Sequence, residues 1–161
     1  MRVYVPATVS MLRQLLDDGS LAPINGTAFA LTPALREYYR AGNEEELEYA
    51  AMSDAARASL RLLATDDISR RVVVAADVDG VRLRPELDAA AVTLAGAVPL
   101  RKVVSVHMDT GEAEKAVRAA AEVIDAADLG DDDAEFTVGG AEDHELAWYT
   151  PTELPFVLEL L

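Results

Sequence analysis

Cysteine is absent from the 161 residues of this sequence. Its absence excludes a disulfide framework, a thiolate zinc site and a cysteine nucleophile. No signal peptide precedes the first strand pattern, because MRVYVPATVSML has no long apolar run and is interrupted by Pro6. The apolar end, VLELL, is too short to span a bilayer and contains Glu159. These features predict a soluble cytoplasmic protein with no membrane partner.

Basic residues are scarce as well. The chain has 14 Lys and Arg against 29 Asp and Glu, which gives a formal net charge of −15. Such a surface repels phosphate backbones, and no segment gathers the few basic side chains together. The charge balance therefore predicts no nucleic-acid partner. An acidic excess commonly serves solubility, so it identifies no partner of another kind.

Apolar residues are plentiful, at 51% of the chain, which is enough to bury a core. We therefore expect one domain over residues 1–161. Alternation of apolar and polar residues, and for residues 72–78 a valine-rich run, predicts four strands, and helical periodicity predicts two long helices. The predicted strands cover residues 2–6, 72–78, 103–108 and 145–149, and the predicted helices cover residues 8–18 and 111–127.

Residues 33–64 carry several helix-start signals. Thr32 before Pro33 and Asn43 three residues before a glutamate are typical N-caps, and Ser53 is a further candidate. We therefore expect two or three short helices here, as an insertion into the domain. The acidic run of residues 44–48 is interpreted as a solvated helix start.

The remaining segments are less regular. The Asp79-Gly80 pair predicts a hairpin in which residues 81–84 return antiparallel to the preceding strand. Residues 85–100 fit either a helical turn or a short strand. Residues 128–135, DLGDDDAE, are expected to form a solvated loop, because they lack the order of a calcium-binding motif. We expect no metal site.

The order of these elements predicts an α+β fold. The predicted order is strand, helix, inserted helices, strand, strand, helix and strand. This order matches the βαββαβ plan of a ferredoxin-like sandwich with a helical insertion. In that plan the first and third strands are neighbours, and the fourth strand flanks the first. The alternative is a three-layer α/β arrangement in which the helices of residues 33–64 cover the second face of the sheet.

Side-chain alternation then predicts a polar sheet face. Val104 and Val106 are expected to face the helices, which directs His107 to the opposite face. Under the ferredoxin-like plan, this outward face collects six ligand or interface candidates from three strands: Arg2, Tyr4, Ser105, His107, Glu145 and Tyr149. We expect Leu146 and Trp148 to point inward.

This face supports two hypotheses. The first is a binding or protein-interaction module without catalytic activity, in which the aromatic-rich face holds a small ligand or is buried in a homodimer. The second is a small enzyme with His107 as general base, because an imidazole pKa of about 6.5 lies near neutral pH. We expect no nucleotide cofactor, since the turn after His107 has one glycine, Gly111, between acidic residues. No serine lies in a G-x-S-x-G motif.

Three segments carry a resemblance to a known family. They are the opening MRVYVPAT, the internal KVVSVHMDTGEA and HELAWYTPTELPFVL near the end. With these motifs in this order, the chain resembles a family of short uncharacterised bacterial proteins that is described only as a domain of unknown function. The resemblance implies a free-standing protein and brings no activity, cofactor or catalytic residue.

Overall fold

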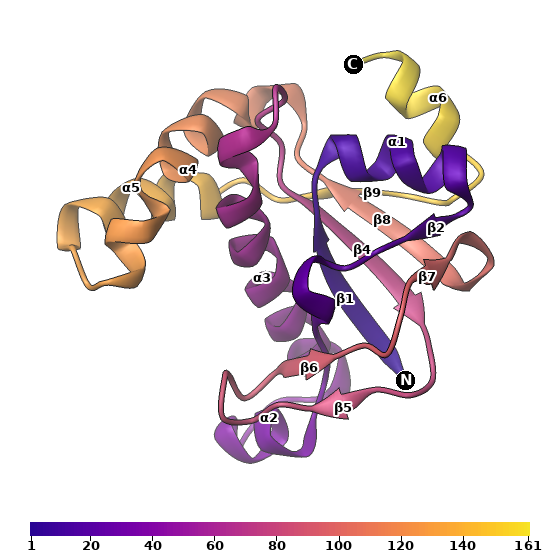
Figure 1. Cartoon of the computed structure of the whole chain (residues 1–161). Helices are drawn as coiled ribbons and strands as arrows, with labels where there is room; N and C mark the ends of the chain where they lie inside the picture. Colours follow the sequence, from indigo (N-terminus) through magenta and orange to yellow (C-terminus); the bar gives the residue numbers. More distant parts are fainter.

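A computed structural model describes all 161 residues, and an antiparallel sheet of seven strands forms its centre (Figure 1). The strand order is β5-β6-β3-β1-β4-β8-β9. The strands are β1 (Arg2–Ala7), β3 (Thr27–Phe29), β4 (Val72–Asp77), β5 (Arg82–Leu83), β6 (Ala91–Thr93), β8 (Val103–Met108) and β9 (Ala147–Tyr149). A separate two-stranded sheet pairs β2 (Ser20–Leu21) with β7 (Val98–Pro99).

Six α-helices surround the sheet. They are α1 (Val9–Asp18), α2 (Pro33–Tyr38), α3 (Glu44–Leu62), α4 (Glu114–Asp128), α5 (Asp132–Glu142) and α6 (Leu154–Glu159). None of them combines the length and the apolar character that crossing a bilayer requires. Two of the predicted N-caps are confirmed. At the start of α2 the Thr32 hydroxyl accepts a hydrogen bond from the Leu35 amide, and at the start of α3 Asn43 Oδ1 accepts one from the Glu46 amide.

The mixed α+β class is confirmed, and the four predicted strands all belong to the main sheet. The ferredoxin-like strand order is wrong. β4 lies between β1 and β8, and β9 pairs with β8 rather than with β1. The reason is β3, a short strand that has no clear alternation in the sequence. β3 occupies the second edge of β1, so no edge of β1 remains for β9.

Helices cover both faces of the sheet. α1 and α6 lie together on one face (Figure 1), over a core that includes Val3, Val5, Leu12, Val74, Val106 and Leu158. α3 lies on the other face, over a core that includes Tyr4, Leu47, Ala51, Ala55 and Val73. The helices of residues 33–64 therefore cover the second face, as the alternative architecture expects. This face needs no second subunit to cover it, and homodimer formation stays a prediction.

The predicted position of α4 is wrong. α4 does not cover the face of Val106, because its buried residues pack with α5 and with the end of α3 in a separate core. The same strand holds a second correction. Val104 is exposed, because a β-bulge shifts the register of β4 and β8 between Ala75 and Ala76. Val103 takes the place of Val104 on the core face.

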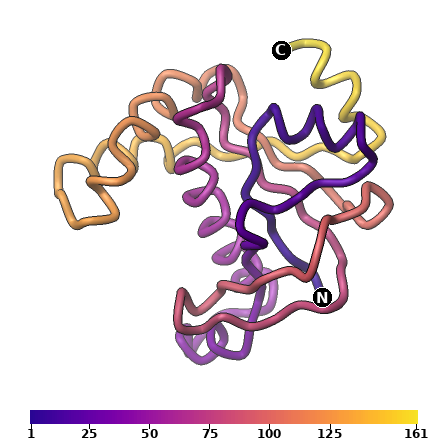
Figure 2. The backbone as a smooth tube through the Cα atoms, viewed as in Figure 1, coloured from indigo at the N-terminus to yellow at the C-terminus, as the bar shows by residue number.

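Three local predictions are also corrected. α3 begins at the Asn43 cap and continues through Ser53, so it is one helix of 19 residues. Residues 82–83 form β5, which pairs with β6 and not with β4, and Figure 2 shows the course of the backbone from β4 into this segment. The loop predicted over residues 128–135 is shorter than expected, because α5 begins at Asp132. Asp131 caps this helix, since its Oδ1 accepts a 2.9 Å hydrogen bond from the Ala134 amide.

A fully buried serine fixes α3 against the sheet. The Ser59 hydroxyl donates to the Ala7 carbonyl oxygen at 2.7 Å and accepts from the Val72 amide at 3.0 Å. Ala7 ends β1 and Val72 begins β4, so a single side chain joins the helix to two central strands. No buried polar side-chain atom is left without a hydrogen-bond partner.

A buried ion pair joins the strands at the same end of the sheet. Arg71 and Asp109 are 4% and 0% exposed, and Arg71 Nη2 lies 2.7 Å from Asp109 Oδ1. Arg71 Nε and its backbone amide also donate to Asp109 Oδ2, and Nη2 donates to the His144 carbonyl at 2.9 Å. Asp109 therefore binds the Arg71 guanidinium through both of its carboxylate oxygens. It ties β4, β8 and the segment before β9 together.

We predict that Asp109→Ala strongly destabilises the protein. Removing one partner leaves the Arg71 guanidinium buried without its counter-charge, which typically costs about 3–5 kcal/mol. Urea denaturation followed by circular dichroism measures this loss in the free energy of unfolding. Asp67→Ala, at an exposed aspartate, serves as the matched control and should change it by less than about 0.5 kcal/mol. Equal effects of the two substitutions would refute the structural role of the pair.

Candidate functional site

Four of the six predicted candidates lie around one hollow. This hollow has a volume of about 250 Å³, and its lining includes Arg2 and Tyr4 from β1 and Ser105 and His107 from β8. They share a face because alternate residues of a strand point to the same side, and Ala75 of β4 lies between the two strands. The prediction that these four side chains share one sheet face holds, although β1 and β8 are not direct neighbours.

The opposite wall of this hollow belongs to α3. Glu45, Glu48, Tyr49 and Met52 line it from the first half of the helix. Their spacing of three, four and seven residues places them on one side of a helix. The first turn of α3 is exposed, as a solvated helix start predicts, and Glu45 and Glu48 of the same run also line the hollow. That spacing is visible in the sequence, but it indicates a site only once α3 is known to cover the sheet.

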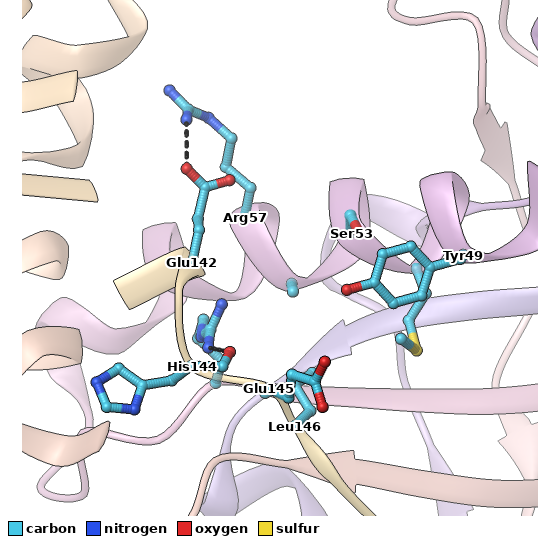
Figure 3. A pocket seen from close by; sticks show the side chains of 10 residues that line it. Tyr49, Ser53, Arg57, Glu142, His144, Glu145 and Leu146 are labelled. Carbon is cyan, nitrogen blue, oxygen red and sulfur yellow. Dashed lines mark hydrogen bonds and ion pairs between the residues drawn. The ribbon is translucent and has the colours of Figure 1, made fainter. Parts of the chain in front are cut away.

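Glu145 lies in a second hollow, of about 180 Å³, which Figure 3 shows. This hollow lies between α3 and the segment of residues 142–146, and Arg71 is among its lining residues. Tyr49 and Met52 line both hollows, so the two adjoin along the same side of α3. We refer to the two hollows together as the α3 cleft.

Tyr149, the sixth candidate, lies on the other face of the sheet. It pairs with Val106 and packs against the core beneath α1 and α6. Trp148, which was expected to point inward, pairs with His107 and is 65% exposed. Directly paired residues point to the same face, so the register with β8 places Trp148 on the side of His107. The inward and outward assignment of this strand was wrong by one residue.

His107 is a neutral hydrogen-bonding group in the α3 cleft. Burial lowers the pKa of His107 from its ordinary value of 6.5, which favours the uncharged ring at neutral pH. Its Nε2 lies 2.9 Å from the Ser105 hydroxyl oxygen, and no carboxylate bonds to the ring. The pair therefore offers a hydroxyl and an imidazole that act as donor or acceptor without carrying charge.

Arg2 and Tyr4 complete the sheet side of the cleft. Arg2 Nε lies 2.7 Å from Asp77 Oδ1 on β4, so its charge is already paired. Burial, followed by the charge of Glu48, raises the pKa of Tyr4 above its ordinary value of 10.0. The Tyr4 hydroxyl thus keeps its proton at neutral pH and remains a hydrogen-bond donor.

The second hollow also contains arginines that are already paired. Arg57 bonds to Glu135 at 2.9 Å and lies 3.8 Å from Glu142, the contact drawn as a dashed line in Figure 3. Arg71 carries the buried pair with Asp109. Tyr49 and Glu145 extend into this hollow from opposite walls (Figure 3).

The residues of the chain do not form a metal centre. No group of three or more His, Cys, Asp or Glu side chains is arranged to hold a metal ion. The acidic segment that includes residues 128–135 instead supplies partners to two arginines: Asp128 binds Arg57 and Arg61, and Glu135 binds Arg57. These contacts join α3 to α4 and α5.

A pair of acidic residues lies on another side of α3. Burial, followed by the charge of Asp88 and a hydrogen bond with it, raises the pKa of Asp54 from its ordinary value of 3.8 to about 6. Asp88 precedes β6, where its Oδ1 accepts from the Ala90 amide at 2.9 Å. Sequence reasoning missed this pair, because the two residues are 34 positions apart in the chain.

A sequence model described as "Family of unknown function (DUF6912)" matches residues 1–158 of the chain. The match agrees with the resemblance carried by the three motifs. No curated protein and no solved structure matches the chain. The comparisons therefore supply no activity for this chain.

We predict that Asp54→Asn stabilises the protein at pH 8 and has little effect at pH 4. The folded pKa of Asp54 lies above its unfolded value, so the wild type loses stability as pH rises from about 4 through about 6. An amide at this position does not ionise, and the gain should reach about 1–2 kcal/mol above pH 7, after allowance for solvent screening. Urea denaturation at several pH values measures this gain, with Asp67→Asn as control. A gain that does not depend on pH would contradict the shifted pKa.

Proposed function

The chain belongs to the family of unknown function DUF6912, and we propose that it is a soluble cytoplasmic module that binds a small polar ligand in the α3 cleft. The observation that carries this proposal is the convergence of Tyr4, Ser105 and His107 from the sheet with Tyr49 from α3 around one hollow. A few convergent polar groups in a concave apolar setting are typical of small-molecule sites.

The side chains that line the cleft favour a site for a small ligand over a protein–protein interface. The Ser105–His107 pair and the Tyr4 hydroxyl provide uncharged hydrogen-bonding groups, and Met52 with the Tyr49 ring provides apolar contact. Pockets that bind drug-sized ligands typically have volumes of about 300–1,000 Å³. Each hollow of the α3 cleft is smaller than that range, so the proposed ligand is a small metabolite or one group of a larger molecule.

We predict that a screen of small polar metabolites by thermal shift finds a compound that raises the melting temperature. At a hundredfold excess over Kd, binding stabilises the folded state by about 2.7 kcal/mol, which corresponds to roughly 5–10 °C for a chain of this size. His107→Ala and Tyr49→Ala should remove most of the shift. Both substitutions take away a side chain that lines the cleft.

The matched control is Tyr38→Ala on α2, because Tyr38 is also a highly exposed tyrosine but does not line the cleft. Its melting temperature should respond to the compound as that of the wild type does. A compound that shifts all four proteins equally binds elsewhere. If no compound shifts the wild type, or if every hit binds elsewhere, the proposed function is wrong.

The 2.9 Å contact between Ser105 and His107 favours a second candidate, a small enzyme. A histidine bonded to a hydroxyl is the core of a nucleophile–base pair, with His107 as general base and Ser105 as nucleophile. Such a pair ordinarily includes a third group that orients the base, and no carboxylate bonds to His107. Binding without catalysis therefore ranks first.

We predict that a fluorophosphonate probe does not label Ser105. Without an oriented base the hydroxyl keeps the low reactivity of an ordinary serine. Intact-mass spectrometry after incubation at pH 8 measures labelling, and the Ser105→Ala variant reports any background. Labelling of the wild type that Ser105→Ala abolishes would favour the enzyme and contradict a purely binding role.

A further inference from the structure

The protein uses only part of the buried Arg71 guanidinium. An arginine side chain has five N–H donors, one on Nε and two on each Nη nitrogen. In Arg71, Nε donates to Asp109 Oδ2 at 2.9 Å, and Nη2 donates to Asp109 Oδ1 at 2.7 Å and to the His144 carbonyl at 2.9 Å. Nη1 takes part in none of the hydrogen bonds of this side chain, so both of its N–H groups have no acceptor in the protein.

These free donors can be reached from the second hollow of the α3 cleft. Arg71 is only 4% exposed, yet it lines this hollow. No fully buried side-chain nitrogen or oxygen lacks a hydrogen-bond partner, so Nη1, which has none, is not fully covered by protein atoms. Leaving a nearly buried donor without an acceptor costs free energy. A ligand that brings an acceptor to Nη1 is therefore favoured.

The charge of this arginine is already balanced. Asp109 binds it through both carboxylate oxygens and is itself fully buried. Glu142 and Glu145 line the same hollow, and its other arginine, Arg57, is paired with Glu135 at 2.9 Å. An anionic ligand would add a charge where carboxylates already outnumber arginines, whereas a neutral acceptor meets no such repulsion.

Besides its charged groups, the second hollow offers an apolar surface. Met52, Ala56 and Leu146 line it, together with the ring of Tyr49. Ser53 adds a hydroxyl group from α3 (Figure 3). The volume of about 180 Å³ admits a short chain or a single ring and is smaller than a pocket for a drug-sized compound.

We infer that the ligand of the α3 cleft carries a neutral carbonyl group, such as that of an amide, whose oxygen accepts from Arg71 Nη1. This inference rests on the proposed function, because it names the class of ligand for the same site. A carbonyl oxygen has two lone pairs and accepts from the guanidinium without bringing a negative charge. The apolar part of the ligand packs on Met52 and Leu146. A protonated amine, in contrast, has no acceptor to offer to Nη1.

The probes for the test are two sets of compounds that differ only in the polar group. Pentanamide and benzamide are the neutral amides, pentanoate and benzoate are the anions, and pentylamine and benzylamine are the cations. Because loss of Arg71 would break the buried ion pair, the side chain stays in place and its guanidinium resonances report the contact directly. Titrations followed by heteronuclear NMR at neutral pH measure these resonances, together with those of Leu146.

We expect both amides to shift the Arg71 guanidinium protons and the Leu146 amide, with Kd values of about 1 mM, while the anions and the amines shift neither. Ser53→Phe places a ring in the second hollow and should weaken amide binding roughly tenfold or more. The matched control is Ser10→Phe, at an exposed serine of α1 that lines neither hollow, and it should bind the amides as the wild type does.

The failures of the two proposals are distinguishable. If neither amide shifts the Arg71 resonances, or if an anion or an amine shifts them as strongly, the carbonyl inference is wrong. Equal binding of the amides by Ser53→Phe and Ser10→Phe would also contradict it. The binding function still stands in these cases if a hit of the metabolite screen depends on His107 and Tyr49, and it is wrong only when no such hit exists.

Discussion

The buried pair of Arg71 and Asp109 is the contact on which the arrangement of the site depends. An arginine at the start of β4 and an aspartate at the end of β8 neutralise each other where water is excluded, and the same guanidinium holds the His144 carbonyl. This fixes the segment that leads into β9 and one part of the α3 cleft. Burying two charges is costly, so the pair contributes specificity of position more than net stability.

The cleft itself follows from how α3 meets the sheet. Small residues, Ala51 and Ala55, let the middle of the helix approach β1 and β4 closely, and the Ser59 hydroxyl fixes its second half. Toward its N-terminus the helix presents Glu45, Glu48 and Tyr49 instead, and these do not fill the space above His107. A polar hollow thus remains next to a close-packed core, and its polar groups stay accessible because the helix covers the face only in part.

Local sequence signals predicted well where most helices and strands lie in the chain, but they did not predict which strands are neighbours in the sheet. The alternation of β1 and β8, the valine-rich run of β4 and the caps of α2 and α3 are short-range features, so a single sequence reveals them. The strand order required knowledge of β3 and β6, which have three residues each and no distinctive alternation. α5 was missed because its acidic start resembles a loop, although Asp131 is a good cap.

For the candidate site, too, the sequence determined some features and the tertiary structure decided the others. The sequence by itself determined that Arg2 and Tyr4 share one face of their strand and that Ser105 and His107 share one face of theirs, because side chains alternate along a strand. That the two pairs lie on the same face of the sheet follows from the pairing of β4 with β1 and with β8. Only the tertiary structure decided that Tyr149 lies on the other face and that α3 supplies the second wall of the cleft. Register, bulges and helix docking depend on packing between distant segments, and no local pattern encodes them.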